Sequence, residues 1–204
     1  MKKMIRTLFA VLLICSTTAL SAQTLTEAQK SQINKRLTTY IEHNKKENYE
    51  AIVDMAYPKV FEIATKEQMI EAFSGLEAQG FEMDFEEMKV TALKPVALSE
   101  AVNYVICPYD MKMTLTLVNE QMRNPETAKA MLGAFEMVYP GGKVTLDEEN
   151  YKIRIEGSKH MMAIQDKKYG DDWYFSEFDE SNAMLLSMMF PEDIITKTKE
   201  IIKD

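Results

Sequence analysis

The chain has 204 residues, a formal net charge of -8 at pH 7 and a hydrophobic content of 46%. Nucleic acids and anionic membranes attract basic surfaces, so a chain this acidic is expected to bind neither. No repeat, low-complexity tract or Pro/Gly/Ser-rich linker interrupts the sequence. A chain of this length can bury one sizeable core, and we expect a single domain after the N-terminal segment.

Residues 1–22 have the pattern of a secretory signal peptide. Three cations precede an apolar run at positions 8–14, and small residues follow it as far as Ala22. The run is too short to span a bilayer, which takes about 18 apolar residues. We therefore expect cleavage after Ala22, a mature chain 23–204 without a membrane span, and a periplasmic or extracellular location.

The two cysteines bear on the leader and on stability. Acylation of Cys15 would make the protein a lipoprotein, but Ile14 stands before it where a small residue is needed. Cleavage after Ala22 would remove three cations and no anions, which lowers the net charge from -8 to -11. Cys107 would then be the only cysteine, so packing rather than an intramolecular disulfide must supply the stability.

The first part of the mature chain has helical patterns. An amphipathic helix is expected from Thr26, which can form a capping box with Gln29, to about position 46. A second helix is expected between Asn48, a residue suited to the N-cap, and Pro58, which cannot continue the hydrogen-bond ladder.

A short strand and a third helix are expected next. The run KVFEIA at 59–64 is apolar and rich in β-branched residues, which predicts the strand. Thr65 and Gln68 can form another capping box, and the helix that they open is expected to end near Gly80.

From Phe81 the apolar period changes from about 3.6 to 2, which indicates β-strands. The alternation slips by one residue at Glu86 and Glu87, as a β-bulge would make it. A longer strand is expected at 102–117, interrupted at Pro108 by an edge or a bend.

The rest of the chain predicts one more helix, two hairpins and a C-terminal helix. The helix spans 124–138 and begins at an Asn-Pro-Glu sequence. The hairpins span 143–157 and 159–178, and Trp173 stands at the start of the last strand. The C-terminal helix is expected at 191–204.

This order of elements resembles the nuclear transport factor 2-like superfamily, which includes ketosteroid isomerase. The resemblance rests on NYEAIVDMAYPKVFEIATKEQMIEAF and HMMAIQDKKYGDDWYFSEF and covers about 26–118 and 158–179. It implies an α+β fold in which helices pack on a strongly curved antiparallel sheet that forms a cone, with a pocket at the wide end. Residues 119–157 would then be an insertion and 180–204 a C-terminal extension.

The resemblance implies that a ligand would bind inside the cone. Methionine occurs 16 times in the chain, and its flexible, polarisable side chain suits varied apolar ligands, although it also serves simply to fill a core. The residues expected to line the site are Tyr57, Met83, Tyr104, Met111, Met113, His160, Met162 and Trp173.

Three functions remain open at this point. The first is non-enzymatic binding of a small apolar or amphipathic ligand or a peptide. The second is an isomerase or dehydratase, as the resemblance implies, with Asp54 or His160 as the base and Tyr57 or Tyr104 as the donor to an oxyanion. The second requires these residues, with Tyr109 and Trp173, to face one cavity.

The third is a homodimer formed through the outer sheet face or the C-terminal helix. The sequence contains no nucleophile elbow, phosphate-binding glycine loop or zinc-ligand spacing. No metal or cofactor is therefore expected.

Overall fold

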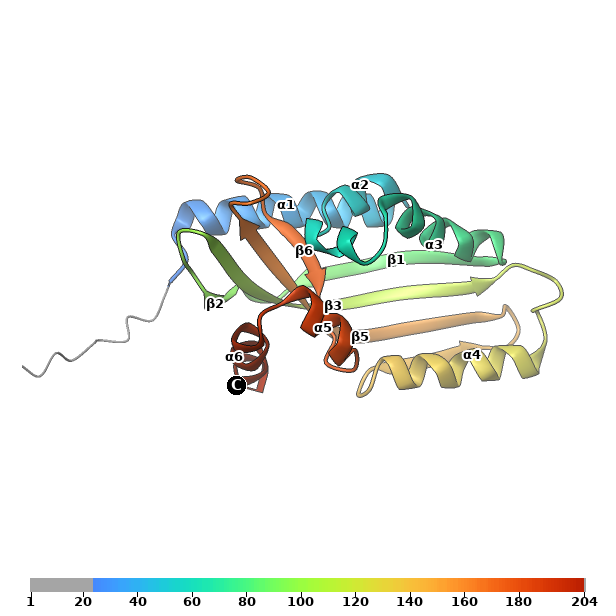
Figure 1. Ribbon diagram of the computed structural model, residues 1–204. Coiled ribbons are helices and arrows are strands. Elements are labelled where there is room, and N and C mark those ends of the chain that lie inside the picture. Colours follow the sequence, from blue (N-terminus) through green and yellow to red (C-terminus); the bar gives the residue numbers. More distant parts are fainter. Residues whose placement is uncertain (1–23, 204) are drawn as a thin grey trace, which may run out of the picture.

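The computed structural model describes residues 24–203, except the side chains of Leu76 and Glu77. Within this part the fold is α+β, with six α-helices and one six-stranded antiparallel sheet (Figure 1). The expected signal peptide, its cleavage site and Cys15 lie outside the described residues.

Helices come first along the chain, and strands dominate its middle. The helical part consists of α1 (Glu27–Lys45), α2 (Tyr49–Asp54), the 3-10 helix η1 (Pro58–Glu62) and α3 (Lys66–Ala78). The middle part consists of β1 (Phe81–Val90), β2 (Lys94–Ala97), β3 (Val102–Leu117), α4 (Pro125–Val138), β4 (Lys143–Asp147), β5 (Lys152–Asp166) and β6 (Tyr174–Glu177). The described chain ends with α5 (Ala183–Met189) and α6 (Glu192–Lys203).

Both expected capping boxes are confirmed. The Thr26 hydroxyl accepts from the Gln29 backbone N–H at 3.2 Å, and the Gln29 side chain accepts from the Thr26 N–H at 2.9 Å. Thr65 and Gln68 make the same reciprocal pair at 3.2 and 2.9 Å. Each pair satisfies backbone donors that the first helical turn leaves free, so the starts of α1 and α3 are set locally.

The strand expected at 59–64 is wrong, because the chain forms η1 at this point. Pairing with β6 is limited to one bridge, in which the Tyr57 N–H donates to the Phe175 carbonyl at 2.8 Å. The next residue is Pro58, which has no N–H to extend the ladder and whose fixed φ suits a helical turn. The chain therefore turns away from the sheet after Tyr57.

The expected bulge in β1 is confirmed. The pairing of β1 with β3 shifts register between Phe85 and Glu87. Alternation of inner and outer side chains resumes after the shift, so that Met83, Phe85 and Met88 all contact the same core.

The strand expected at 102–117 is not broken at Pro108, but Pro108 does lie at a local edge, which was one of the two alternatives expected there. The pairing of β3 with β5 runs without a register shift from Val102 opposite Asp166 to Thr116 opposite Lys152. On its other side β3 pairs first with β2 and then with β1, and the Thr91 N–H donates to the Pro108 carbonyl at 2.9 Å between them. The missing N–H of Pro108 points to this same side, where no regular ladder needs it. β5 is likewise one strand through position 157, where two separate strands were expected.

The central strands are covered differently along their length. In β3, each residue from Asn103 to Cys107 is buried, whereas Asp110 and Lys112 are exposed between buried neighbours. The fully buried part lies between α1 on one face and α5 and α6 on the other. α5 and α6 therefore cover one half of the back of the sheet.

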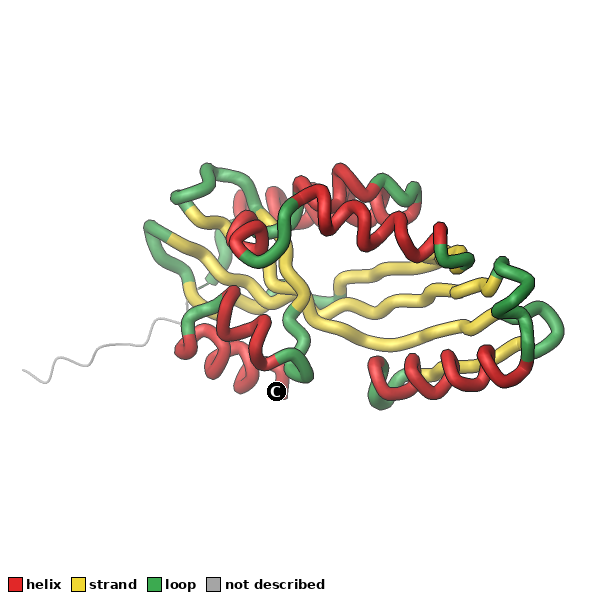
Figure 2. The backbone as a smooth tube through the Cα atoms, turned by 45° about the vertical axis from the view of Figure 1, so that its right-hand side comes forward, coloured by secondary structure: helices red, strands yellow, loops and turns green. Residues whose placement is uncertain are grey.

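The sheet is open, in the order β1-β3-β5-β4, with β2 and β6 extending its other half. Figure 2 shows β3 and β5 bending along their length, with α3 beside β1 at one edge of the sheet and α4 beside β4 at the other, and both helices line one cavity on the same face of the sheet. The helix expected at 124–138 and the hairpin expected at 143–157 are confirmed as α4, β4 and the start of β5, and that they form an insertion stays a prediction. Together these helices and strands surround a cavity.

Candidate ligand-binding cavity

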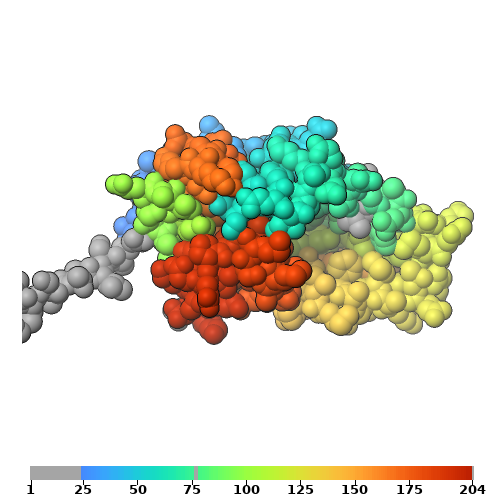
Figure 3. Space-filling view, viewed as in Figure 1, coloured from blue at the N-terminus to red at the C-terminus, as the bar shows by residue number. Residues whose placement is uncertain are grey.

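A cavity of about 570 Å³ lies over the part of the sheet that α5 and α6 leave uncovered. Figure 3 shows the surface hollowed between the teal and green segments of α2 and α3 and the yellow segment that carries α4. Its volume falls in the range of about 300–1,000 Å³ that is usual for small-molecule sites.

Apolar side chains form the floor and two walls of this cavity. Phe73 belongs to α3 on one wall, and Met131 and Phe135 belong to α4 on the opposite wall. The floor consists of inward-facing residues of β1 and β3, namely Phe81, Met83, Phe85, Met88, Met111, Met113 and Leu115. Thioethers and aromatic rings can adjust to ligands of different shape.

One end of the cavity is polar. Tyr109 of β3 donates its hydroxyl proton to Oε1 of Glu177 of β6 at 2.5 Å. The Lys159 ammonium lies 3.9 Å from Oδ2 of Asp179 and 4.7 Å from the centre of the Tyr139 ring. An apolar chamber with polar groups at one end is the arrangement that an amphipathic molecule requires.

The surroundings of Glu177 raise the pKa of its carboxyl group. The side chain is open to solvent from the cavity, yet protein atoms surround it on most sides. The resulting desolvation raises the pKa of Glu177 above its ordinary value, although the hydrogen bond from Tyr109 and the charge of Lys159 act in the opposite direction. Burial, followed by the charge of Glu177, raises the pKa of Tyr109. Tyr109 therefore remains a hydrogen-bond donor at neutral pH.

A second, smaller cavity of about 210 Å³ adjoins the first. Tyr40, Phe73 and Glu177 line both, and Met161, Phe175 and Met189 line the second alone. Glu177 thus lies at the boundary between two apolar chambers.

Comparison of the sequence with protein-family models and with curated proteins found no match. The geometry of the cavity must therefore carry the assignment of function.

Three of the eight residues expected to bind a ligand line the main cavity, namely Met83, Met111 and Met113. Tyr104 and Met162 instead pack on the opposite face of the sheet, against α5 and α6. Tyr104 and Met111 could line one cavity only if the strand changed face at the interruption expected at Pro108. Since β3 is continuous, Tyr104 and Met111, which are seven positions apart, point to opposite faces.

Tyr57 and Trp173 have structural contacts outside the main cavity. Tyr57 lines the smaller cavity and donates to Oδ2 of Asp166 at 2.7 Å. Trp173 is 1% exposed in the core, and its indole N–H donates to Gln32 at 3.4 Å. We conclude that Trp173 anchors the turn between β5 and β6 to α1.

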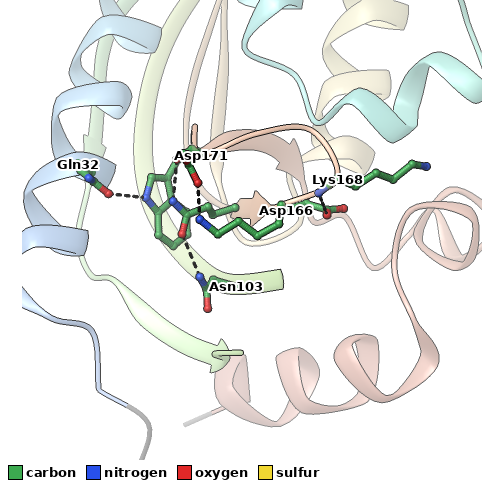
Figure 4. A network of polar contacts seen from close by, with 8 residues as sticks. Gln32, Asn103, Asp166, Lys168 and Asp171 are labelled. Carbon is green, nitrogen blue, oxygen red and sulfur yellow. Dashed lines mark hydrogen bonds and ion pairs between the residues drawn. The ribbon is translucent and has the colours of Figure 1, made fainter. Parts of the chain in front are cut away.

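Figure 4 shows the polar network around this turn. The Asn103 amide donates to Gln165 at 3.0 Å, and Gln165 donates to the Asp171 carbonyl at 2.7 Å. The Lys168 N–H donates to Oδ1 of Asp166 at 2.9 Å. These contacts fix the turn from within and leave its polar groups engaged in structure.

The expected base and donor pairs do not form in this structure. α2 ends at Asp54, whose exposed carboxylate is paired with Lys66 at 2.5 Å, while Tyr57 is buried. His160 lines a shallow groove with Asp179 and Glu180 on the other side of β5. Of the residues that were expected to share one cavity, Tyr109 is the one in the main cavity.

Sequence reasoning did not identify Glu177, Lys159, Asp179 and Tyr139. A signal for Glu177 is present, because Trp173, Phe175 and Glu177 alternate along one strand and the first two are buried. An acid that continues an inward-facing apolar series is a reason to expect a polar group inside a cavity.

Nowhere in residues 24–203 do three or more His, Cys, Asp or Glu side chains form a group that could hold a metal ion. None of the helices in the described range is both long and apolar enough to cross a bilayer.

Proposed function

We propose that this protein reversibly binds one small amphipathic molecule in the cavity between α3 and α4 and does not transform it. The observation that carries the proposal is the combination of a methionine and aromatic floor with a polar end at Tyr109 and Glu177. The apolar body of the ligand would lie on the floor and its polar group would reach Glu177.

Tyr109 is the reason to favour binding over catalysis. Its single hydroxyl proton is donated to Glu177, so it is not free to stabilise an oxyanion on a substrate. An isomerase or dehydratase remains the second candidate, because a carboxyl with a raised pKa beside a cavity can act as a general base. In that reaction Glu177 would take the proton and Tyr139 would be the donor, since its hydroxyl has a weak acceptor, the Met113 sulfur at 4.0 Å.

A homodimer is the third candidate, and the structure offers it little apolar surface on the back of the sheet. The half of that face near α5 and α6 is covered. The other half presents charged side chains such as Lys112 and Glu156.

Membership of the nuclear transport factor 2-like superfamily and a cone-shaped interior are part of the proposal. The helices on one face of a bent antiparallel sheet and the cavity between them support it. The 3-10 helix at Pro58–Glu62 and the open sheet depart from the expected pattern.

Export is proposed from the N-terminal sequence alone. Expression of the full chain in a secreting bacterial host should yield a mature protein whose N-terminus is Gln23. Intact mass and N-terminal sequencing would distinguish this product from uncleaved protein and from a protein acylated at Cys15.

The binding proposal is tested with the mature protein and a panel of alkyl amphiphiles, fatty acids and sterols. A ligand that prefers the folded state raises the Tm, and the dissociation constant is then measured by calorimetry. Met83→Trp would fill the floor of the cavity and should weaken binding roughly tenfold or more. Met137→Trp is the matched control, because Met137 is 79% exposed and does not line the main cavity. The absence of binding across the panel, or equal affinity in Met83→Trp, would refute the proposal.

A further inference from the structure

The charges in the cavity wall limit the polar group that a ligand can carry. The wall contains one cation, Lys159, and two carboxylates, Glu177 and Asp179. Lys159 lies near Asp179 and over the Tyr139 ring. The cation is thus already engaged, and the cavity holds one more negative group than positive.

Glu177 retains acceptor capacity toward the cavity. A carboxylate has about four lone-pair sites on its two oxygens, and the hydrogen bond from Tyr109 to Oε1 occupies one of them. Glu177 is exposed and lines the cavity. A ligand that brings a hydrogen-bond donor can therefore reach it directly.

Aromatic rings gather around this carboxylate. Tyr40, Tyr109 and Tyr139 all line the cavity, and Tyr109 is close enough to the other two to interact with them electrostatically. The face of an aromatic ring attracts a cation, and Lys159 over Tyr139 is one instance of this contact within the cavity.

The possible polar groups of a ligand differ in their electrostatic interaction with Glu177 and Asp179. A carboxylate or phosphate would add negative charge beside Glu177 and Asp179, which repel it. A hydroxyl could donate to Glu177 but would leave the excess charge in place. A protonated amine would donate a charge-assisted hydrogen bond and neutralise that charge at the same time.

We infer that the ligand carries a protonated amine, which donates to Glu177 among the tyrosine rings while its apolar body lies on the methionine floor. This inference rests on the binding function proposed above. It specifies the ligand class as a cationic amphiphile.

The test compares head groups on one alkyl chain. Decylamine, decanol and decanoate are titrated into the mature protein by calorimetry at neutral pH, the two charged compounds below their critical micelle concentrations and decanol below its solubility limit. Wild type is expected to bind decylamine roughly tenfold or more tightly than decanoate, which is the lower end for a hydrogen bond to a charged group.

Glu177→Gln keeps an acceptor for Tyr109 and removes the charge. It should weaken decylamine binding roughly tenfold and leave decanol binding within about a factor of three. Glu82→Gln is the matched control on β1, because Glu82 is exposed and does not line the main cavity, and it should bind like wild type.

The outcomes separate the two claims. Equal or tighter binding of decanoate by wild type, or unchanged decylamine binding by Glu177→Gln, overturns the inference and leaves the binding proposal standing. Failure of all three compounds and of the wider panel to bind overturns the proposed function itself. The wild-type ratio decides the inference even if Glu177→Gln does not fold.

Discussion

The Tyr57 hydroxyl donates to Oδ2 of Asp166 at 2.7 Å, across 109 residues of sequence. Tyr57 is 4% exposed and immediately precedes η1, while Asp166 ends β5. The contact therefore ties the helical part of the chain to a central strand of the sheet. Asp54, three positions earlier, takes no part in it.

Replacement of Tyr57 should distinguish this buried contact from the exposed one beside it. Tyr57→Phe leaves a buried carboxylate oxygen without its donor and should lower the free energy of unfolding by about 1–3 kcal/mol. Asp54→Asn removes an exposed ion pair and should cost less than about 1 kcal/mol. Urea unfolding of both variants gives the comparison, and equal losses would contradict it.

Glu177 should make stability depend on pH in a defined direction. Its pKa is raised in the folded state, mainly by desolvation, so the folded protein holds this proton more tightly than the unfolded chain does. The contribution is complete below the unfolded pKa of about 4.3 and is lost as pH rises through the folded pKa. Glu177→Gln avoids this loss and should raise the Tm at pH 7.

The difference in Tm between Glu177→Gln and wild type should shrink as pH falls toward 4. Calorimetric scans at several pH values would measure it. A difference that stays constant with pH would mean that Glu177 does not hold its proton in the folded protein as described.

Two methionines on opposite faces of the sheet should respond differently to truncation. Met162 is fully buried against α5 and α6, and Met162→Ala should lower the free energy of unfolding by about 2–5 kcal/mol. Met111→Ala should lower the free energy of unfolding by less. Met111 borders an existing open cavity, so its truncation enlarges that cavity and creates no new closed one. Ligand affinity should change in Met111→Ala alone, which calorimetry can check.

Two glycines provide a test of backbone geometry. Gly80 has φ +91, and a Cβ there would lie 2.3 Å from the Asn119 Cβ, so Gly80→Ala should destabilise the protein. Gly75 lies within α3, where an added Cβ would meet nothing within 4 Å, so Gly75→Ala should stabilise it by about 0.5–1 kcal/mol. Denaturant midpoints that shift in the same direction would contradict this assignment.

The elements that sequence predicted best are those with local signals. Capping residues at Thr26, Thr65 and Asn124, and the phase slip before Glu87, depend on neighbours within a few positions. The failure at residues 59–64 has a different cause. A short apolar, β-branched run is compatible with a strand as well as with a helical turn. Which of the two forms depends on whether a sheet edge is available for pairing beyond Pro58, and here the chain forms η1.

The site was harder to predict because burial on both faces hides the phase of a strand. In β3 the buried positions include both Tyr104 and Val105, so apolar character could not show which side chain faces the cavity. The exposed charges at Asp110 and Lys112 do show it, and counting back from them places Tyr109 inside. Glu177 could have been found from the sequence, because it continues the alternation of Trp173 and Phe175 along the last strand of the expected hairpin.

The unequal cover of β3 has a consequence for the motions of the protein. Amide protons at Val105 and Ile106 lie between helices on both faces, so their exchange with solvent should require global unfolding. The amide protons at Met113 and Leu115 lie under the cavity, in a part of β3 whose other face carries the exposed Lys112. Smaller, local openings should therefore allow them to exchange. The protein can thus loosen around a ligand while the rest of the sheet stays folded.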